Sequence, residues 1–271
     1  MGTVEAGIAA IARDRRSGSS ALLGRGVDLL RRVGGDREAL AEASAKLCSA
    51  QPAMAGFRTL AALMRAAPDP AAAIDRFALQ IARAPAAVAR HAVSVLQLRA
   101  GGGPLRLVTC SASQTVEAAI EAAAAYGEIV ACCAEARPVM EGRDLAARLA
   151  GAGITTELYT DAGIGAALPG AECVLVGADA VGPESFINKV GTGALCALAQ
   201  SMRVPVYVLA GREKVLSAAD LAALELSGGP GAEVWAEAPT GVAVRNPYFE
   251  VVSFSHVSAV VTDTSVQNIS V

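Results

Sequence analysis

The stretch from Glu172 to Gln200 decides the interpretation of this chain: ECVLVGADAVGPESFINKVGTGALCALAQ. It opens on an apolar run, Cys173 to Val176, that is typical of a strand buried on both faces, and it closes on the helical spacing of Ala194 to Met202. Between them we expect a loop that presents Asp179 at the carboxyl end of a parallel sheet. The loop then leads into a helix whose amino-terminus carries Lys189.

A helix start of this kind attracts anions. Its first backbone N–H groups are unpaired, the helix dipole is positive there, and Lys189 would add a full charge. The stretch therefore predicts a phosphorylated small molecule as ligand. The alternative is a strand, a tight turn and a capped helix, with Lys189 on a solvated face.

The pattern on either side of this stretch indicates two domains. Residues 1–98 have helical spacing, and we expect four or five helices there. Arg99 to Pro104, RAGGGP, is the clearest break in composition. Beyond it, over residues 104–271, apolar runs alternate with helical patterns, which predicts an α/β, doubly wound, mostly parallel Rossmann-like sheet. The expected strands are Leu105–Thr109, Ile129–Cys133, Thr155–Tyr159, Cys173–Val176, Val206–Leu209 and Ala259–Thr262, and the expected helices are Thr115–Tyr126, Gly142–Ala150, Ile164–Leu168, Gly193–Met202 and Ala218–Leu224.

Composition excludes several classes of function. Of the 271 residues, 53% are hydrophobic, and the formal net charge is −3, so direct nucleic-acid binding is not expected. Six cysteines without CxxC spacing and two isolated histidines predict neither a metal site nor disulfides, which favours the cytoplasm. No signal peptide or membrane-length apolar run is present, and no GxGxxG follows the first expected strand. We therefore expect a soluble protein without a cofactor.

Two further loops lie at the carboxyl ends of expected strands, where open α/β sheets bind ligands. Thr109 to Gln114, TCSASQ, is a hydroxyl-rich turn that suits either an anion or the cap of the next helix. In Glu135 to Gly142, EARPVMEG, Arg137 precedes a proline and is held extended, so its guanidinium can reach a phosphate. Alternatively, Arg137 is a surface residue at a strand end. Asp161, after the third strand, is suited to cap the helical pattern Ala162 to Ala167.

The string GAD…NKVGT over Gly177 to Thr192 resembles a family signature. The family joins 5-methylthioribose-1-phosphate isomerases, ribose-1,5-bisphosphate isomerases and the regulatory subunits of eukaryotic translation initiation factor 2B. The resemblance implies that Asp179 is a catalytic acid/base and that Asn188 and Lys189 line a sugar-phosphate pocket.

Weaker matches extend the resemblance from Asp14 to Asn246 and imply further site residues. The turn at Thr109 is similar to one whose cysteine is the partner acid/base; Ser111 stands in that place and Cys110 one residue earlier, so both are candidates. Glu141 replaces a glutamine that binds substrate in the isomerases. The segment after Asp14 resembles one that holds the substrate phosphate, which implies roles for Arg16 and Gly18.

Two functions follow as hypotheses. The first is an aldose-ketose isomerase of the pentose 1-phosphate type, in which Asp179 and either Cys110 or Ser111 move protons. The second is a non-catalytic ligand-sensing or assembly subunit, favoured by the departures at Ser111 and Glu141. We also expect a homodimer or a higher even oligomer, because relatives pair through their carboxyl-terminal domains and the apolar tail Val251 to Val261 would otherwise be exposed.

Overall fold

The computed structural model describes residues 2–97, 103–226 and 228–269. Its amino-terminal part is helical and packs around a shared core that includes the buried Leu22, Leu40, Phe57 and Met64. The predicted break at Arg99–Pro104 falls largely on residues 99–102, outside the described residues, so the division into two domains stays a prediction. The helices are α1 (Gly2–Arg13), α2 (Ser19–Val33), α3 (Arg37–Ala50), α4 (Ala55–Ala66) and α5 (Pro70–Gln97).

The seven-stranded sheet confirms the predicted doubly wound fold. Its order is β10-β9-β7-β4-β1-β2-β3, and every strand pair is parallel except the last, β9 with β10. The chain builds outward from β1 to β3 on one side and from β4 to β9 on the other. The strands are β1 (Leu105–Thr109), β2 (Ile129–Ala134), β3 (Thr155–Tyr159), β4 (Cys173–Gly177), β7 (Val206–Leu209), β9 (Ala259–Val261) and β10 (Val266–Asn268).

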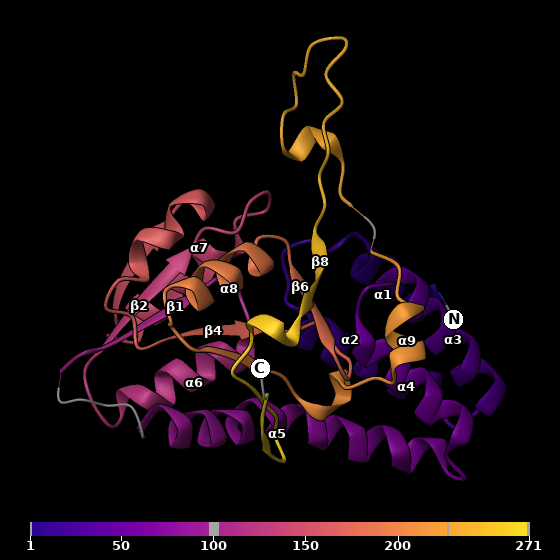
Figure 1. The fold of residues 1–271 in the computed structure, drawn as a ribbon. Coiled ribbons are helices and arrows are strands. Elements are labelled where there is room, and N and C mark those ends of the chain that lie inside the picture. Colours follow the sequence, from indigo (N-terminus) through magenta and orange to yellow (C-terminus); the bar gives the residue numbers. More distant parts are fainter. Residues whose placement is uncertain (1, 98–102, 227, 270–271) are drawn as a thin grey trace.

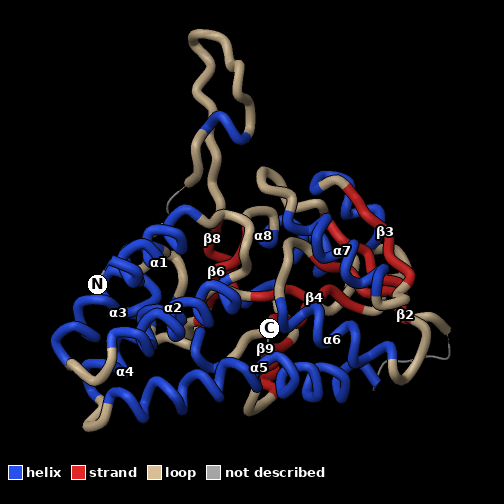
Figure 2. Tube along the Cα trace, turned by 180° about the vertical axis from the view of Figure 1, so that it is seen from behind, coloured by secondary structure: helices blue, strands red, loops and turns tan. Residues whose placement is uncertain are grey.

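Helices cover both faces of this sheet, so its central strands are buried throughout. Successive residues of one strand alternate between two cores: Cys173 and Leu175 pack toward one, Val174 and Val176 toward the other. The first core receives α5, α6 (Gln114–Ala124) and α7 (Glu141–Gly151), and the second receives the 3₁₀ helix η1 (Asp161–Ala167) and α8 (Thr192–Ser201). α5 runs beneath both parts of the molecule, as the front and rear views show (Figure 1, Figure 2).

A small antiparallel sheet, absent from the sequence prediction, lies between the two parts. It pairs β6 (Ser185–Lys189) with β5 (Ala180–Val181) on one side and with β8 (Phe249–Ser253) on the other. The expectation that Lys189 lies at a helix start is therefore wrong: it ends strand β6. The apolar tail is also largely internal, because Val252, Val257 and β9 are buried within the chain. Its burial removes the argument that the tail requires a partner.

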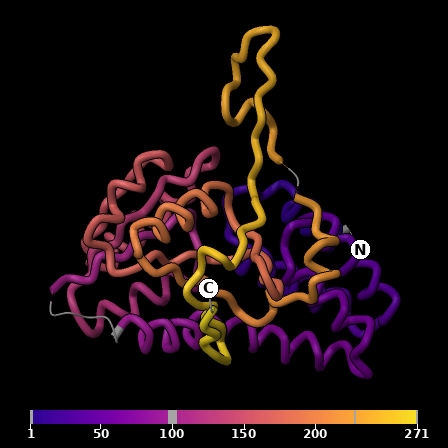
Figure 3. The backbone as a smooth tube through the Cα atoms, in the orientation of Figure 1, coloured from indigo at the N-terminus to yellow at the C-terminus, as the bar shows by residue number. Residues whose placement is uncertain are grey.

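Residues 228–247 form a long loop, called the arm, that projects away from the body between β8 and the shorter segments before it (Figure 1, Figure 3). Those segments are η2 (Arg212–Lys214) and α9 (Ala218–Ala222), and the arm itself holds η3 (Gly231–Glu233). Trp235 and Val242 are exposed on it. After β8 the chain forms η4 (Phe254–His256). Across the described residues, no helix is both long and apolar enough to span a bilayer.

Candidate functional site

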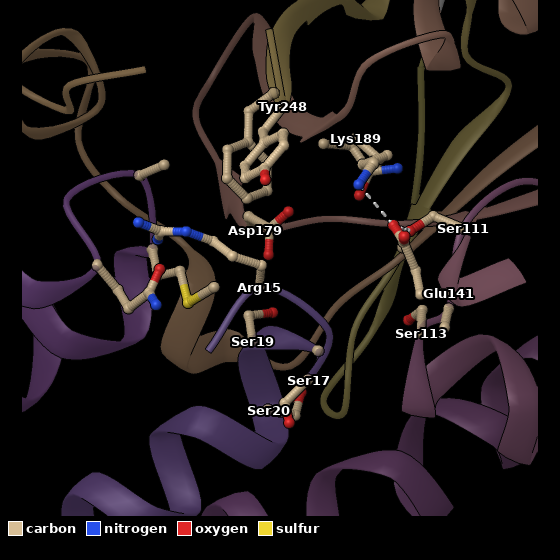
Figure 4. Close-up of a pocket in the computed structure, with 18 of the residues that line it drawn as sticks. Arg15, Ser17, Ser19, Ser20, Ser111, Ser113, Glu141, Asp179, Lys189 and Tyr248 are labelled. Atoms are coloured by element: carbon tan, nitrogen blue, oxygen red, sulfur yellow. Dashed lines mark hydrogen bonds and ion pairs between the residues drawn. The ribbon is translucent and has the colours of Figure 1, made fainter. Parts of the chain in front are cut away.

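A cavity of about 360 Å³ lies at the carboxyl ends of β1 and β4 (Figure 4). These strands are neighbours in the sheet, and the chain leaves them in opposite directions, so the cavity sits where open α/β sheets commonly bind ligands. The helical part closes it with residues 14–20 and 49–54. Its lining includes eight of the nine residues that the sequence singled out for the site, the exception being Arg137. The eight are Arg16, Gly18, Cys110, Ser111, Glu141, Asp179, Asn188 and Lys189.

Asp179 follows β4 and is fixed by its backbone on both sides. Its N–H donates to the Ile187 carbonyl at 2.8 Å, and its carbonyl accepts from the Ala55 N–H at 3.1 Å. Gly177 allows the close turn, because a Cβ at this position would lie 2.6 Å from Ser113 Oγ. Burial raises the pKa of the Asp179 carboxyl, while the positive charge of Lys214 opposes the rise. A carboxyl in this setting suits proton transfer near neutral pH.

Lys214 is a buried cation of the site that the set of predicted site residues missed. Its Nζ donates to Ser19 Oγ at 2.9 Å and to the Ala178 carbonyl at 2.8 Å. It thus joins the start of α2 to the loop before Asp179. The available signal was its position just after the β7 strand sequence VPVYVLA.

Cys110 and Ser111 both line the cavity, but their side chains have different hydrogen-bond partners. The Cys110 Sγ lies 3.4 Å from Thr192 Oγ1, and burial raises the pKa of the thiol to about 11, so it stays protonated at neutral pH. Ser111 has a φ of 63°, which a non-glycine residue adopts rarely, and its Oγ donates to Glu141 Oε1 at 2.8 Å. Cys110 is therefore the available acid of the two.

Lys189 does not offer a free charge to a ligand. Its Nζ lies 2.8 Å from Glu141 Oε1, and the two side chains are only 8% and 9% exposed. The Nζ also lies 5.1 Å from the centroid of the Tyr248 ring. Glu141 begins α7, where Gly142 lets the helix approach β2, since a Cβ on Gly142 would overlap the Ala134 carbonyl oxygen.

The start of α8 is likewise occupied by protein groups. Glu250 of β8 accepts the Gly193 N–H at 2.8 Å, so the anion at this helix end is the protein's own carboxylate. Thr192 Oγ1 donates to the Lys189 carbonyl at 2.6 Å and accepts from Asn188 Nδ2 at 3.0 Å. A ligand anion at this helix start would have to compete with the Glu250 carboxylate, so its binding there stays a prediction, and Asn188 does line the cavity.

The start of α2 is a more open helix end. Gly18 is its N-cap and provides no side-chain hydrogen bond, and residues 15–20 line the cavity. Asp14 holds the preceding turn by accepting the N–H groups of Arg16 and Ser17 at 2.9 and 2.8 Å. Arg16 itself is exposed, with Nη2 2.9 Å from Asp144 Oδ2. Backbone donors and cations thus converge at this end of the cavity.

Arg137 does not belong to the cavity lining, contrary to the sequence-based prediction. Its Nη2 donates to the Val234 carbonyl of the arm at 3.1 Å. Asp161 accepts the N–H groups of Ala136 and Arg137 at 2.8 and 2.7 Å, so it braces this loop. The described residues hold no cluster of three or more His, Cys, Asp or Glu side chains suited to a metal ion.

The model of the initiation factor 2 subunit family matches residues 7–268. A methylthioribose-1-phosphate isomerase from Syntrophus aciditrophicus is 30% identical over 245 residues, which cover 83% of this chain and 64% of the relative. A probable bifunctional methylthioribose-1-phosphate isomerase/methylthioribulose-1-phosphate dehydratase from Nocardia farcinica is 32% identical over 202 residues, 66% of this chain and 36% of the relative. The chain thus spans between about a third and two thirds of the length of these curated relatives.

Solved structures show the same fold. The translation initiation factor eIF-2B of Pyrococcus horikoshii superposes with a TM-score of 0.82 at 24% identity, covering 98% of this chain and 97% of that one. The 5-methylthioribose 1-phosphate isomerase of the same organism gives 0.67 at 19% identity, with 97% and 83% covered. At these identities the likeness concerns the fold alone.

Proposed function

Because the chain belongs to the initiation factor 2 subunit family, we propose that it binds a phosphorylated sugar in the cavity and interconverts its aldose and ketose forms. The observation that carries the proposal is the pairing of two proton-transfer groups in one cavity: the Asp179 carboxyl, with its raised pKa, and the protonated Cys110 thiol. The names of the curated isomerase relatives support the same reaction class.

The reaction needs two such groups. Converting a cyclic pentose 1-phosphate into its open-chain ketose breaks the bond between C1 and the ring oxygen and turns the C2 hydroxyl into a carbonyl. One hydrogen moves from C2 to C1, and one proton moves from the C2 hydroxyl to the ring oxygen. In our proposal the ionised Asp179 accepts the proton of the C2 hydroxyl, the Cys110 thiol protonates the ring oxygen, and the hydrogen passes from C2 to C1 within the substrate. Transfer of the proton from Asp179 back to Cys110 restores the enzyme. Proton movement is then balanced within the enzyme and substrate, and no external oxidant or reductant is consumed.

The phosphate is proposed to lie at the start of α2. Arg15, Gly18 and the first residues of α2 all line the cavity, and a helix start beside a cation favours phosphate. The start of α8 is already occupied by Glu250 and is less suited. Asn188, which also lines the cavity, is proposed to contact the sugar.

A ligand screen tests the proposal. Pentose 1-phosphates at about 100 times their dissociation constant should stabilise the folded protein by about 2.7 kcal/mol and so raise its melting temperature. Phosphorus NMR of the same mixtures should show conversion to the ketose phosphate. If no phosphorylated sugar shifts the melting temperature or is converted, the proposal is wrong.

A second candidate function is a non-catalytic ligand-sensing or assembly subunit. One observation favours it: Ser111, which stands where the isomerases have a catalytic cysteine, is engaged by Glu141 and has an unfavourable φ. The initiation-factor names of similarly folded structures agree with this candidate. A melting shift without conversion of any sugar phosphate would favour it over the isomerase.

The same proposal includes an assembly and a location. We propose an even-numbered homo-oligomer, most simply a homodimer, in which the arm with its exposed Trp235 and Val242 contacts a partner. A similarly folded chain comes from a tetrameric eIF2B-beta2-delta2 complex. A cytoplasmic location is part of the proposal, because the cysteines show no spacing typical of a disulfide framework. Residues 1–98 and 104–271 are proposed as its two domains.

A further inference from the structure

We infer that Glu141 restricts the cavity to ligands that carry a single phosphate, because it occupies Lys189, the cation that a second phosphate would require. The inference rests on the proposed sugar-phosphate function and adds the substrate subclass to it. Its basis is the contact geometry on the cavity wall formed by α7 and β6.

The ion pair of Lys189 and Glu141 is stabilised by its burial and by neighbouring side chains. Its atoms lie 2.8 Å apart in nearly buried side chains, where solvent screens the attraction weakly. Ser111 Oγ donates to the same Glu141 oxygen, and the Tyr248 ring lies beside the ammonium. In Figure 4 Lys189, Glu141 and Ser111 form one group on one side of the cavity, Arg15 extends toward the other side, and Tyr248 and Asp179 lie between them. A phosphate arriving at Lys189 would have to break this group.

The second carboxylate oxygen of Glu141 also favours a sugar hydroxyl over a phosphate at this wall. Oε2 is buried and has no hydrogen-bond partner among the described residues, although Glu141 lines the cavity. A buried acceptor without a donor is costly, and a small movement of the side chain would let a sugar hydroxyl supply that donor. A phosphate is negatively charged and would repel the Glu141 carboxylate there. This wall therefore suits the hydroxyl-bearing part of a sugar.

The opposite end of the cavity is suited to the one phosphate. Among the lining cations within the described residues, Arg16 pairs with Asp144 and Lys214 donates to Ser19 and Ala178. Arg15 lines the cavity, and the structure shows no carboxylate partner for it in the described part of the chain. One anionic group can bind at this end without displacing a protein carboxylate.

Isothermal titration with two sugars tests the inference: ribose 1-phosphate, and ribose 1,5-bisphosphate. The wild type should bind the monophosphate at least roughly tenfold more tightly, the scale of one charge-assisted contact. A ribose 1-phosphate with a neutral methylthio group at C5 controls for bulk and should bind like the monophosphate. Glu141→Gln keeps the shape and frees Lys189, so the preference should fall by roughly tenfold or more.

Two further variants locate the effect. The double variant Glu141→Gln, Lys189→Ala should lose the gain in bisphosphate affinity, because the freed cation is gone. Glu135→Gln is the matched control, since Glu135 lies in the preceding loop, pairs with Arg143 and is outside the cavity lining. It should leave the preference unchanged.

The outcomes separate the two proposals. Monophosphate binding with equal bisphosphate binding by the wild type overturns the inference and leaves the proposed function intact, and this comparison holds even if Glu141→Gln does not fold. A folded Glu141→Gln variant with an unchanged preference also overturns it. Failure of the wild type to bind any of the three sugars overturns both.

Discussion

Replacing Lys214 by methionine removes a buried charge from the site while preserving most of the side-chain volume. The wild-type ammonium makes two hydrogen bonds, of 2.9 Å to Ser19 and 2.8 Å to the Ala178 carbonyl. A charge-assisted hydrogen bond contributes about 1.5–3 kcal/mol, and the two are coupled, so we expect a loss of roughly 3 kcal/mol in the free energy of unfolding. For a chain of this size that lowers the melting temperature by roughly 6–12 °C.

The same variant should change the pH dependence of turnover. Burial raises the pKa of Asp179, and the Lys214 charge lowers it. Without that charge the pKa rises further, and a base must be ionised to act. The acid limb of the kcat/KM profile should therefore move to higher pH, so activity at mildly acidic pH falls more than activity at alkaline pH.

Initial rates from pH 5 to 9, together with thermal melts, measure both effects. The matched control is Lys46→Met, because Lys46 is an exposed lysine paired with Glu42 and contributes little. If Lys214→Met is folded and active with an acid limb at the wild-type pH, the charge of Lys214 does not act on Asp179 and the reasoning is refuted.

Three other perturbations have defined outcomes. Gly142→Ala would place a Cβ against the Ala134 carbonyl oxygen, so urea denaturation should show a loss of at least about 1–3 kcal/mol; wild-type stability would contradict the tight approach of α7 to β2. The pKa of Cys110, raised by burial to about 11, means that the folded state holds this proton more tightly than the unfolded state. Wild type should therefore lose stability relative to Cys110→Ala as pH rises from about 8.5 through 11, and a pH-independent difference would argue against it. Light scattering should give an even multiple of the chain mass, and fluorescence of Trp235, the single tryptophan, should shift to the red on dissociation; a monomer at micromolar concentration would exclude the proposed assembly.

The main sheet was predictable from local sequence because its strands are buried on both faces. The predicted bounds of β1, β3 and β7 coincide with those observed, and the helices between strands lie where their apolar spacing indicated. The position of Asp179 in the cavity followed from the same rule, since it comes directly after a central strand. These features depend on residues close together in the chain.

The other parts of the site depend on contacts between distant segments. β6 is stabilised by β8, which lies about 60 residues later. The periodicity of apolar residues within either segment does not indicate that they pair. The ion pair of Lys189 with Glu141, and the capping of α8 by Glu250, link segments in the same way. Lys189 and Glu141 were both among the residues predicted for the site, and both line the cavity, whereas Glu250 was not predicted. Lys189 was assigned to a ligand because the sequence did not indicate that Glu141 would lie beside it.

The most direct test of the central claim compares wild type with Asp179→Asn in turnover and in binding. Asparagine nearly preserves the shape of the side chain but cannot accept the proton. The account predicts that the wild type converts a pentose 1-phosphate into its ketose, and that Asp179→Asn retains the ligand-induced melting shift but converts none of it. Wild-type turnover that survives in Asp179→Asn would contradict the account.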